Sequence, residues 1–220
     1  MGRRVIYLLA LVVFVQTIYP ITMVGEAGLL FYQLCYAALI TVGILVARRN
    51  PLYTRLLIVL GGVYLLAGIA YTLNPGVEWI VLLTYVVLIP FQATVIWVLF
   101  RFIFLEKQVT RDVIYAAIAV YLLLGAIFVP VYGLIDELTY LQTGTNAFSD
   151  GLFTDDAVFP WQNLVYYSYA TLTTLGYGDV LPVTMVARSV VSMEAVIGVL
   201  FVTIIMARLV ALYVAPVEDN

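Results

Sequence analysis

The chain of 220 residues contains no histidine and a single cysteine, Cys35. An intrachain disulfide is therefore impossible, and neither a Cys/His zinc site nor a His-based catalytic triad can be assembled. Basic residues number only ten, and they form no patch of the kind that binds nucleic acid. We expect no nucleic-acid partner, no enzymatic activity and no organic or metal cofactor.

Charge is scarce as well: 10% of the residues are charged and 65% are hydrophobic, whereas a soluble domain is about one quarter charged. Six apolar runs are long enough to cross a bilayer. They cover residues 4–24, 29–47, 53–73, 79–104, 113–135 and 184–214. The composition predicts an all-α integral membrane protein with six transmembrane helices.

Eight of the ten basic residues fall at or near alternate connections between these runs, and the connections between them are acidic or uncharged. These eight are Arg3, Arg4, Arg48, Arg49, Arg101, Lys107, Arg111 and Arg208. Since cytoplasmic loops are enriched in Lys and Arg, both termini are predicted to be cytoplasmic in a multi-pass cell-membrane protein. The first run could be a signal peptide, but it is long for one and lacks a clear cleavage site, so we expect it to be retained.

Residues 173–179 read Thr-Thr-Leu-Gly-Tyr-Gly-Asp. The two glycines let the backbone reach conformations that put successive carbonyls on one side. Four such strands around an axis would stack rings of oxygens that replace the hydration shell of a potassium ion. A stretch too short to span, 164–172, precedes the segment, and a spanning run follows it. Non-helical backbone can lie at the depth of the membrane only where protein buries it or where it lines a water-filled path. A loop between a short helix and a spanning helix can meet this condition.

This string resembles the filter of potassium channels, usually Thr-Val-Gly-Tyr-Gly, with Leu175 in place of valine. The resemblance extends from Asp112 to about Ala215. It implies a pore domain at 112–220 that comprises an outer helix, an acidic turret, a re-entrant pore helix, the filter and an inner helix. Residues 1–111 would form a four-helix N-terminal membrane domain. One filter strand per chain implies a homotetramer that conducts K⁺ through a central pore.

The resemblance also assigns the site residues. The K⁺-binding filter would be formed by Thr174, Leu175, Gly176, Tyr177 and Gly178, with the Thr174 hydroxyl as the innermost ring. The filter would be supported, and its outer mouth would be formed, by Thr173, Tyr166, Tyr167 and Asp179. Some relatives carry a glutamate that pairs with the outer aspartate where this chain has Ala170, so that acid pair is absent. We predict that Tyr167 donates a hydrogen bond to Asp179 instead.

The inner helix carries the gating candidates. Gly198 matches a hinge glycine, but close helix packing explains a membrane glycine equally well. Glu194 is an ionisable group inside the membrane. It could accept hydrogen bonds behind the filter or titrate and gate, and the structural role is favoured because no base is evident nearby. Val199, Val202 and Met206 would line the lower cavity, where apolar side chains allow a dewetting gate.

Residues 136–163 would form a solvated outer turret that concentrates cations at the mouth. Its acidic residues are Asp136, Glu137, Asp150, Asp155 and Asp156. The fourth run occupies the position that the voltage-sensing helix has in voltage-gated channels, but it carries no charge between Glu78 and Arg101. We therefore expect weak or no voltage dependence. Pro90 is expected to interrupt that helix.

Three alternatives remain open. The first is a poorly selective monovalent cation channel, which would have the same fold. The second is a secondary transporter, which would need inverted repeats. The third is a membrane enzyme, which would need a cluster of polar residues at one depth. No ligand-sensing domain fits in 215–220, so gating would come from lipid, tension, pH or a separate regulatory subunit. The compact loops suggest a prokaryotic cell membrane.

Overall fold

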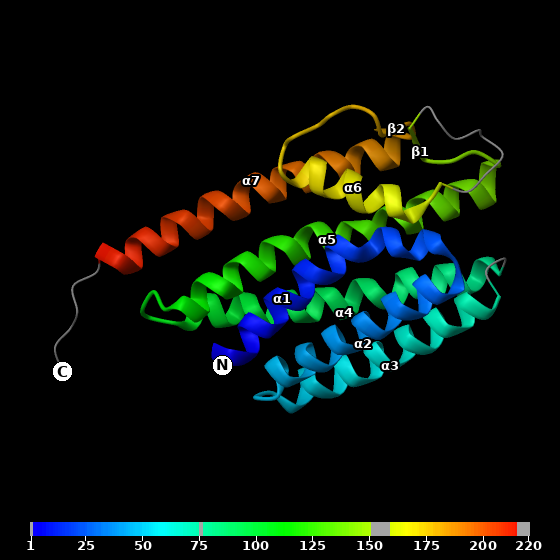
Figure 1. The fold of residues 1–220 in the computed structure, drawn as a ribbon. Helices are drawn as coiled ribbons and strands as arrows, with labels where there is room; N and C mark the ends of the chain where they lie inside the picture. The colour runs from blue at the N-terminus through cyan, green and yellow to red at the C-terminus, as the bar shows by residue number, and fades with distance from the viewer. Residues whose placement is uncertain (1, 75–76, 151–158, 215–220) are drawn as a thin grey trace.

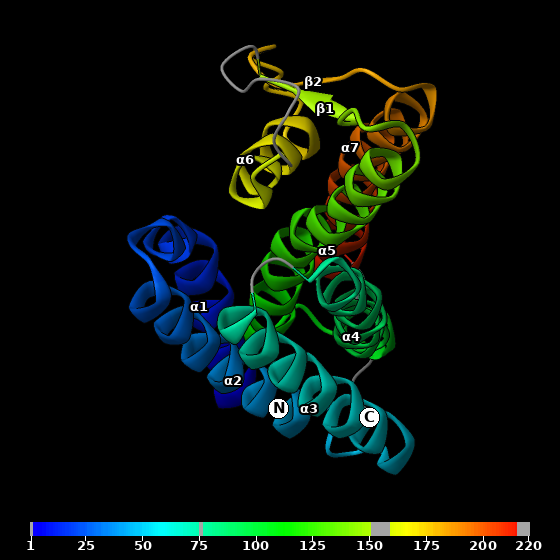
Figure 2. The same ribbon diagram turned by 90° about the vertical axis from the view of Figure 1, so that its right-hand side faces the viewer.

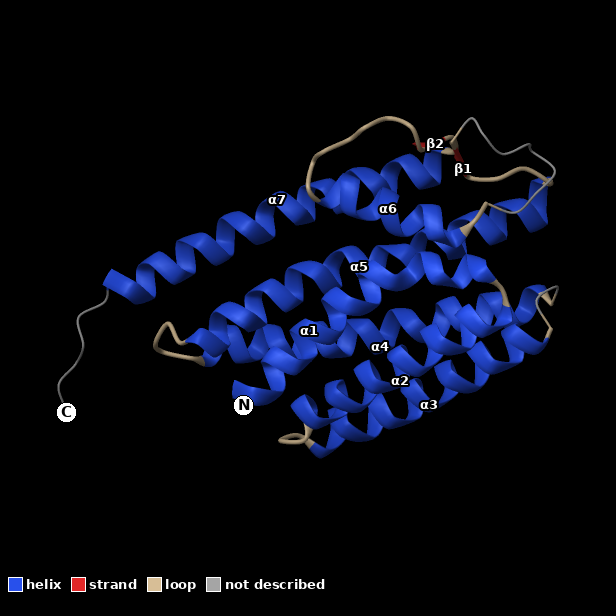
Figure 3. Ribbon diagram, viewed as in Figure 1, coloured by secondary structure: helices blue, strands red, loops and turns tan. Residues whose placement is uncertain are grey.

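The computed structural model describes residues 2–74, 77–150 and 159–214, and almost all of them are helical (Figures 1 and 3). The elements in chain order are α1 (Gly2–Ile18), the 3₁₀ helix η1 (Tyr19–Val24), α2 (Glu26–Ala47), α3 (Pro51–Leu73), α4 (Glu78–Leu105), α5 (Arg111–Thr143), β1 (Phe148–Ser149), α6 (Trp161–Leu172), β2 (Leu181–Pro182) and α7 (Met185–Val214). The all-α class is confirmed.

Six helices are long and apolar enough to cross a membrane, as the hydropathy pattern predicts. The first of these spans consists of α1 continued by η1. The helices run alternately up and down. The start of α1, the turn at 48–50, the connection at 106–110 and the end of α7 all lie at one end of the bundle (Figure 1). The basic connections therefore share one end, which we call the basic end.

Capping residues fix several helix boundaries. The Asn50 side chain accepts from Leu52 N at 3.0 Å, with Pro51 at the first position of α3. Thr110 caps α5 by accepting from Val113 N, and Gly144 closes the same helix with a left-handed φ of 72°. These are the preferred starts and ends of helices.

The end of α5 differs from the prediction. The helix continues to Thr143 rather than stopping near 135, and Asp136 and Glu137 lie inside it, only 1% and 5% exposed. Their assignment to a solvated turret was wrong. Asp136 Oδ1 accepts from Ala147 N at 2.7 Å and from Phe148 N at 3.2 Å, and such bonds allow a carboxylate to remain buried.

Of the other predicted turret acids, Asp150 accepts from the Asn163 side chain at 2.8 Å, which ties the turret to α6. Asp155 and Asp156 lie outside the described residues. The outer segment thus holds two of its acidic side chains, Asp136 and Asp150, in specific hydrogen bonds.

Helix α4 is also not interrupted at Pro90, contrary to expectation. Proline lacks the N–H that would donate to the carbonyl of Val86, four residues earlier, and membrane helices tolerate this loss. One turn later, Thr94 Oγ1 donates to the Pro90 carbonyl at 2.7 Å, and α4 continues on both sides of Pro90. The proline is therefore accommodated within a continuous helix.

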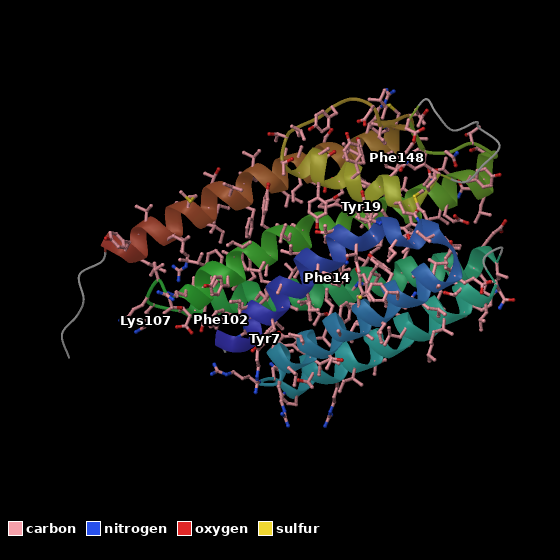
Figure 4. The ribbon with its side chains drawn as sticks, in the orientation of Figure 1. Tyr7, Phe14, Tyr19, Phe102, Lys107 and Phe148 are labelled. Atoms are coloured by element: carbon pink, nitrogen blue, oxygen red, sulfur yellow. The ribbon has the colours of Figure 1, made fainter. Side chains whose placement is uncertain are left out.

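Helix α5 is the centre of the molecule. It contacts α1 and α4 on one side and α6 and α7 on the other. Figure 2 shows α1, α2, α3 and α4 grouped beside α5, with α6 and α7 on its other side. One buried cluster draws on α1–α5 and the lower part of α7, and a second joins α5, β1, α6 and the start of α7. Tyr19, labelled in Figure 4, packs against both.

At the basic end, α7 is attached to the connection between α4 and α5. Arg208 Nη2 donates to the Phe104 carbonyl at 2.7 Å and to the Glu106 carbonyl at 3.1 Å. The guanidinium carbon also lies 5.1 Å from the centre of the Phe104 ring. Lys107 and Phe102 mark this connection in Figure 4. Arg208 thereby links the last helix to the end of the fourth.

Candidate functional site

The segment between α5 and α7 contains a helix too short to cross a bilayer. Helix α6 has 12 residues, which corresponds to about 18 Å of length, against the roughly 30 Å of a hydrocarbon core. The chain that follows α6 returns to β2 near the end of the bundle from which α6 started (Figure 1). The tip of this excursion is the Thr-Leu-Gly-Tyr-Gly string.

The backbone of this string alternates in handedness. Thr174, Gly176 and Gly178 have positive φ values of 59°, 55° and 80°, and Leu175 and Tyr177 between them do not. In a regular strand successive residues point to opposite sides. Left-handed conformations at every second residue rotate the peptide units so that successive carbonyls share one side.

The glycines at 176 and 178 are required by their dihedral angles and not by space. A Cβ built on either would meet no atom within 4 Å, but positive φ is unfavourable for residues with a side chain. Thr174 adopts the same region as a non-glycine residue, which stores local strain. Hydrogen bonds from Leu175 N and Gly176 N to the Ala170 carbonyl, at 2.8 and 3.2 Å, hold the start of the string against α6.

Tyr177 and Asp179 are both held by Tyr166. The rings of Tyr166 and Tyr177 are stacked, with centroids 6.1 Å apart and planes 9° from parallel. The Tyr166 hydroxyl donates to both Asp179 oxygens, at 3.0 and 2.8 Å. Desolvation, together with the hydrogen bond and charge of Asp179, raises the pKa of Tyr166 to about 12. The hydroxyl therefore stays protonated and remains a donor at physiological pH.

The prediction that Tyr167 is the donor to Asp179 was wrong. Neighbouring residues on a helix point about 100° apart, so only one of the two tyrosines can face the outer mouth. Tyr167 faces α5 and β1 instead, with its ring centroid 5.7 Å from that of Tyr132 and 5.6 Å from that of Phe148. Phe148 is labelled in Figure 4.

Glu194 is completely buried behind α6. Its Oε2 accepts from the Tyr132 hydroxyl, and its Oε1 lies 2.5 Å from Ser168 Oγ. Ser168 Oγ is also 2.7 Å from the Gly125 carbonyl oxygen. These contacts agree with the structural role favoured for Glu194. Sequence reasoning missed its partners Tyr132 and Ser168, because an aromatic and a small polar residue in apolar helices carry no local signal.

The hydrogen count in this cluster indicates the protonation state of Glu194. The Ser168 hydroxyl has one hydrogen but faces two acceptors, the Gly125 carbonyl and the Glu194 carboxyl. The Ser168 hydrogen could be shared between the two acceptors, but both contacts are full two-centre hydrogen bonds only if the carboxyl carries a proton and donates it to Ser168 Oγ. We therefore interpret Glu194 as a neutral acid that bridges α5, α6 and α7.

Gly198 is a close-packing position. A Cβ at this residue would overlap the Leu172 carbonyl oxygen at the end of α6, and α7 is helical throughout Met185–Val214. Of the two roles considered, packing is the one visible in this conformation. Val199, Val202 and Met206 follow on α7 and are exposed in the single chain. Thr173 ends α6, and its hydroxyl donates to the Tyr169 carbonyl at 2.6 Å.

The residues beyond the string are held by the turret. Strands β1 and β2 pair antiparallel, with Phe148 opposite Pro182, and Val183 N donates to the Ala147 carbonyl at 2.9 Å. Within the described ranges, no group of three or more Cys, Asp or Glu side chains could hold a metal ion. The chemistry that this site offers is a row of backbone carbonyls.

Comparison with protein families gives a match over residues 116–215 to the family model described as "Ion channel". This range covers nearly all of α5, and all of α6, the Thr-Leu-Gly-Tyr-Gly string and α7. The molecule is thus a membrane protein with an ion-channel domain. The match supports the potassium channel family that the sequence resembles. Searches of curated proteins and of solved structures found no match.

Proposed function

We propose that four copies of this chain form a potassium-selective channel that passes K⁺ down its electrochemical gradient. The carbonyls of Thr174, Leu175, Gly176 and Tyr177 would form stacked rings around the ion path, with the Thr174 hydroxyl as the innermost ring. The observation that carries this proposal is the left-handed backbone at residues 174, 176 and 178. Such alternation aims successive carbonyls in one direction, and a dehydrated cation needs that arrangement.

A geometric argument supports the proposed homotetramer. One strand can surround only part of an ion, so several identical strands must meet around an axis. The surfaces that would meet are uncovered in the single chain: the filter residues are exposed, as are large apolar side chains along α7. Val202 and Met206 would then line the lower cavity as an apolar gate.

The proposed orientation of the chain in the membrane rests on the distribution of its basic residues. The basic end would face the cytoplasm, so both termini would be cytoplasmic and the filter would open to the outside of the cell membrane. The C-terminal end of α6 would point into the pore, where the partial negative charge of a helix end favours a cation. Asp179 and Gly178 would form the outer mouth.

The first four helices would form a domain separate in function from the pore domain at 112–220. Helix α4 carries no charge between Glu78 and Arg101. Because a voltage sensor needs several charges that cross the field, we propose weak or no voltage dependence. Gly198 and Glu194 would act as packing and support positions for the filter.

Ion flux through purified protein in liposomes tests this function. We expect flux driven by K⁺ and Rb⁺ gradients, no flux driven by a Na⁺ gradient, and loss of all flux in Gly176→Ala. Gly144→Ala is the matched control, since Gly144 also has positive φ and open space around its Cβ position but lies outside the filter. It should conduct as the wild type does.

The results separate the alternatives. Equal Na⁺ flux would favour a poorly selective cation channel, for which Leu175 in place of valine is the relevant departure. Flux that survives Gly176→Ala would refute the carbonyl filter. Flux that requires an opposing ion gradient would instead indicate a secondary transporter.

A further inference from the structure

A cavity lies between the first four helices and the pore side of the molecule. Its volume is about 100 Å³, and it is partly open to the surroundings. Six helices contribute to its wall, α1 to α6. Because the cavity is partly open, an occupant could lie partly inside it and partly outside. No step of ion conduction uses this space.

The wall of the cavity is apolar and aromatic. Tilted aromatic rings pack along one side: the centroids of Tyr32 and Tyr36 are 5.4 Å apart, and those of Tyr36 and Tyr64 are 5.0 Å apart. None of the described residues that line the cavity is charged. Since an unpaired charge is very costly in an apolar site, an occupant must be neutral and mostly apolar.

A few polar groups remain available to an occupant. The Oε1 atom of Gln33 is buried and has no hydrogen-bond partner among the described residues. The side chain itself lies against Gly68, and both residues line the cavity. The hydroxyls of Tyr64 and Tyr85, also in the wall, have no hydrogen bond to any described residue. A buried acceptor without a donor is unfavourable, so the occupant should supply a donor.

The cavity also reaches the helix that precedes the filter. Trp161 and Val165 of α6 are part of its wall, and the Trp161 ring lies 5.7 Å from that of Tyr32. Next to it, Gln162 Nε2 donates to Thr22 Oγ1 at 3.0 Å, which links α6 to η1. An occupant would therefore touch both the first four helices and the support of the filter.

We propose that this cavity is a regulatory site for a neutral membrane amphiphile that has an apolar body and a hydroxyl group. The body fills the aromatic space, and the hydroxyl donates to Gln33. Occupancy stabilises the packing of α6 on the first four helices and so changes ion flux. The binding part stands on the cavity alone, whereas the regulatory part rests on the proposed channel function.

Photolabelling of the full chain in mild detergent tests the binding. The probe is dodecan-1-ol that carries a diazirine, with unlabelled dodecan-1-ol and its methyl ether as competitors. The ether has the same apolar body but no donor. We expect labelling on cavity residues such as Tyr64 and Tyr85, and competition by the ether that is about fivefold to tenfold weaker than by the alcohol.

Two variants make the test specific. Gln33→Leu should remove the difference between alcohol and ether, and Val81→Phe, which fills part of the cavity, should reduce labelling. Gln142→Leu, at an exposed position near the end of α5, should leave both unchanged. Equal competition by the two compounds in the wild type, or labelling confined to residues outside the cavity, would overturn the site.

Liposome flux then tests the regulation. Dodecan-1-ol should change K⁺ flux in the wild type more than the ether does, and the difference should vanish in Gln33→Leu. Labelling of the cavity without any difference in flux would refute the regulatory part alone. Absence of all flux would count against the channel function, and the labelling result would still stand.

Discussion

Substitution of Glu194 can show whether its buried carboxyl group is protonated or ionised. If the carboxyl is protonated, Gln is its close match. The amide oxygen accepts from the Tyr132 hydroxyl, and the amide nitrogen donates to Ser168 Oγ, which still donates to the Gly125 carbonyl. Glu194→Gln should therefore change the free energy of unfolding by less than about 1 kcal/mol, since each hydrogen bond has a replacement.

Glu194→Ala should be far more damaging. The Tyr132 hydroxyl, itself fully buried, would lose its acceptor at a cost of about 1–3 kcal/mol. The removed methylene and carboxyl would leave a cavity between α5, α6 and α7 and further reduce packing. We expect a total loss of about 3–5 kcal/mol. Glu26→Ala, at the exposed first turn of α2, is the control and should cost only about 0.3–1 kcal/mol.

Thermal unfolding in detergent micelles, followed by near-ultraviolet circular dichroism, ranks the three variants against the wild type. The expected order of midpoints places Glu194→Gln near the wild type, the control slightly below, and Glu194→Ala lowest. A glutamine variant as unstable as the alanine variant would refute the neutral-acid interpretation. An alanine variant as stable as the control would refute the structural role altogether.

Three further predictions concern the filter support and the basic end. Tyr166→Phe should make K⁺ flux decay faster, because Asp179 loses its donor, and Tyr167→Phe should not; identical decay in both would contradict the assignment. Gly198→Ala should lower stability by about 1–3 kcal/mol through overpacking. Gly62→Ala, with open space around it, should be neutral or stabilising in the same thermal assay. Arg208→Gln should cost about 1–3 kcal/mol and alter the steady K⁺ flux, and unchanged flux and midpoint would show that the anchor has no role.

The parts of the fold that follow from composition could be predicted from sequence. A span of about 20 apolar residues is a local property, and the six helices agree with six apolar runs. The left-handed positions also have a local cause, because glycine at 176 and 178 indicates positive φ angles that other residues avoid. Thr174 was expected in the filter, but its φ of 59° is visible only in the structure.

The errors arose where distant helices decide the outcome. A charged pair such as Asp136 and Glu137 looks like the end of a membrane helix. The backbone amides of Ala147 and Phe148, which lie beyond the end of that helix, help to explain why Asp136 stays buried. The choice between Tyr166 and Tyr167 depends on how α6 is rotated against α5. Packing sets that rotation, and two adjacent tyrosines give no hint of it.

The contacts that support the Thr-Leu-Gly-Tyr-Gly string are formed between residues of the same chain. Tyr166 holds Asp179, Ser168 and Tyr132 hold Glu194, and the Ala170 carbonyl holds the string itself. A newly synthesised chain can thus shape this segment before it meets any partner. If four chains form the proposed ring, each mixed ring in a cell that makes both normal and defective chains contains one to three damaged supports. Such alleles should therefore be dominant.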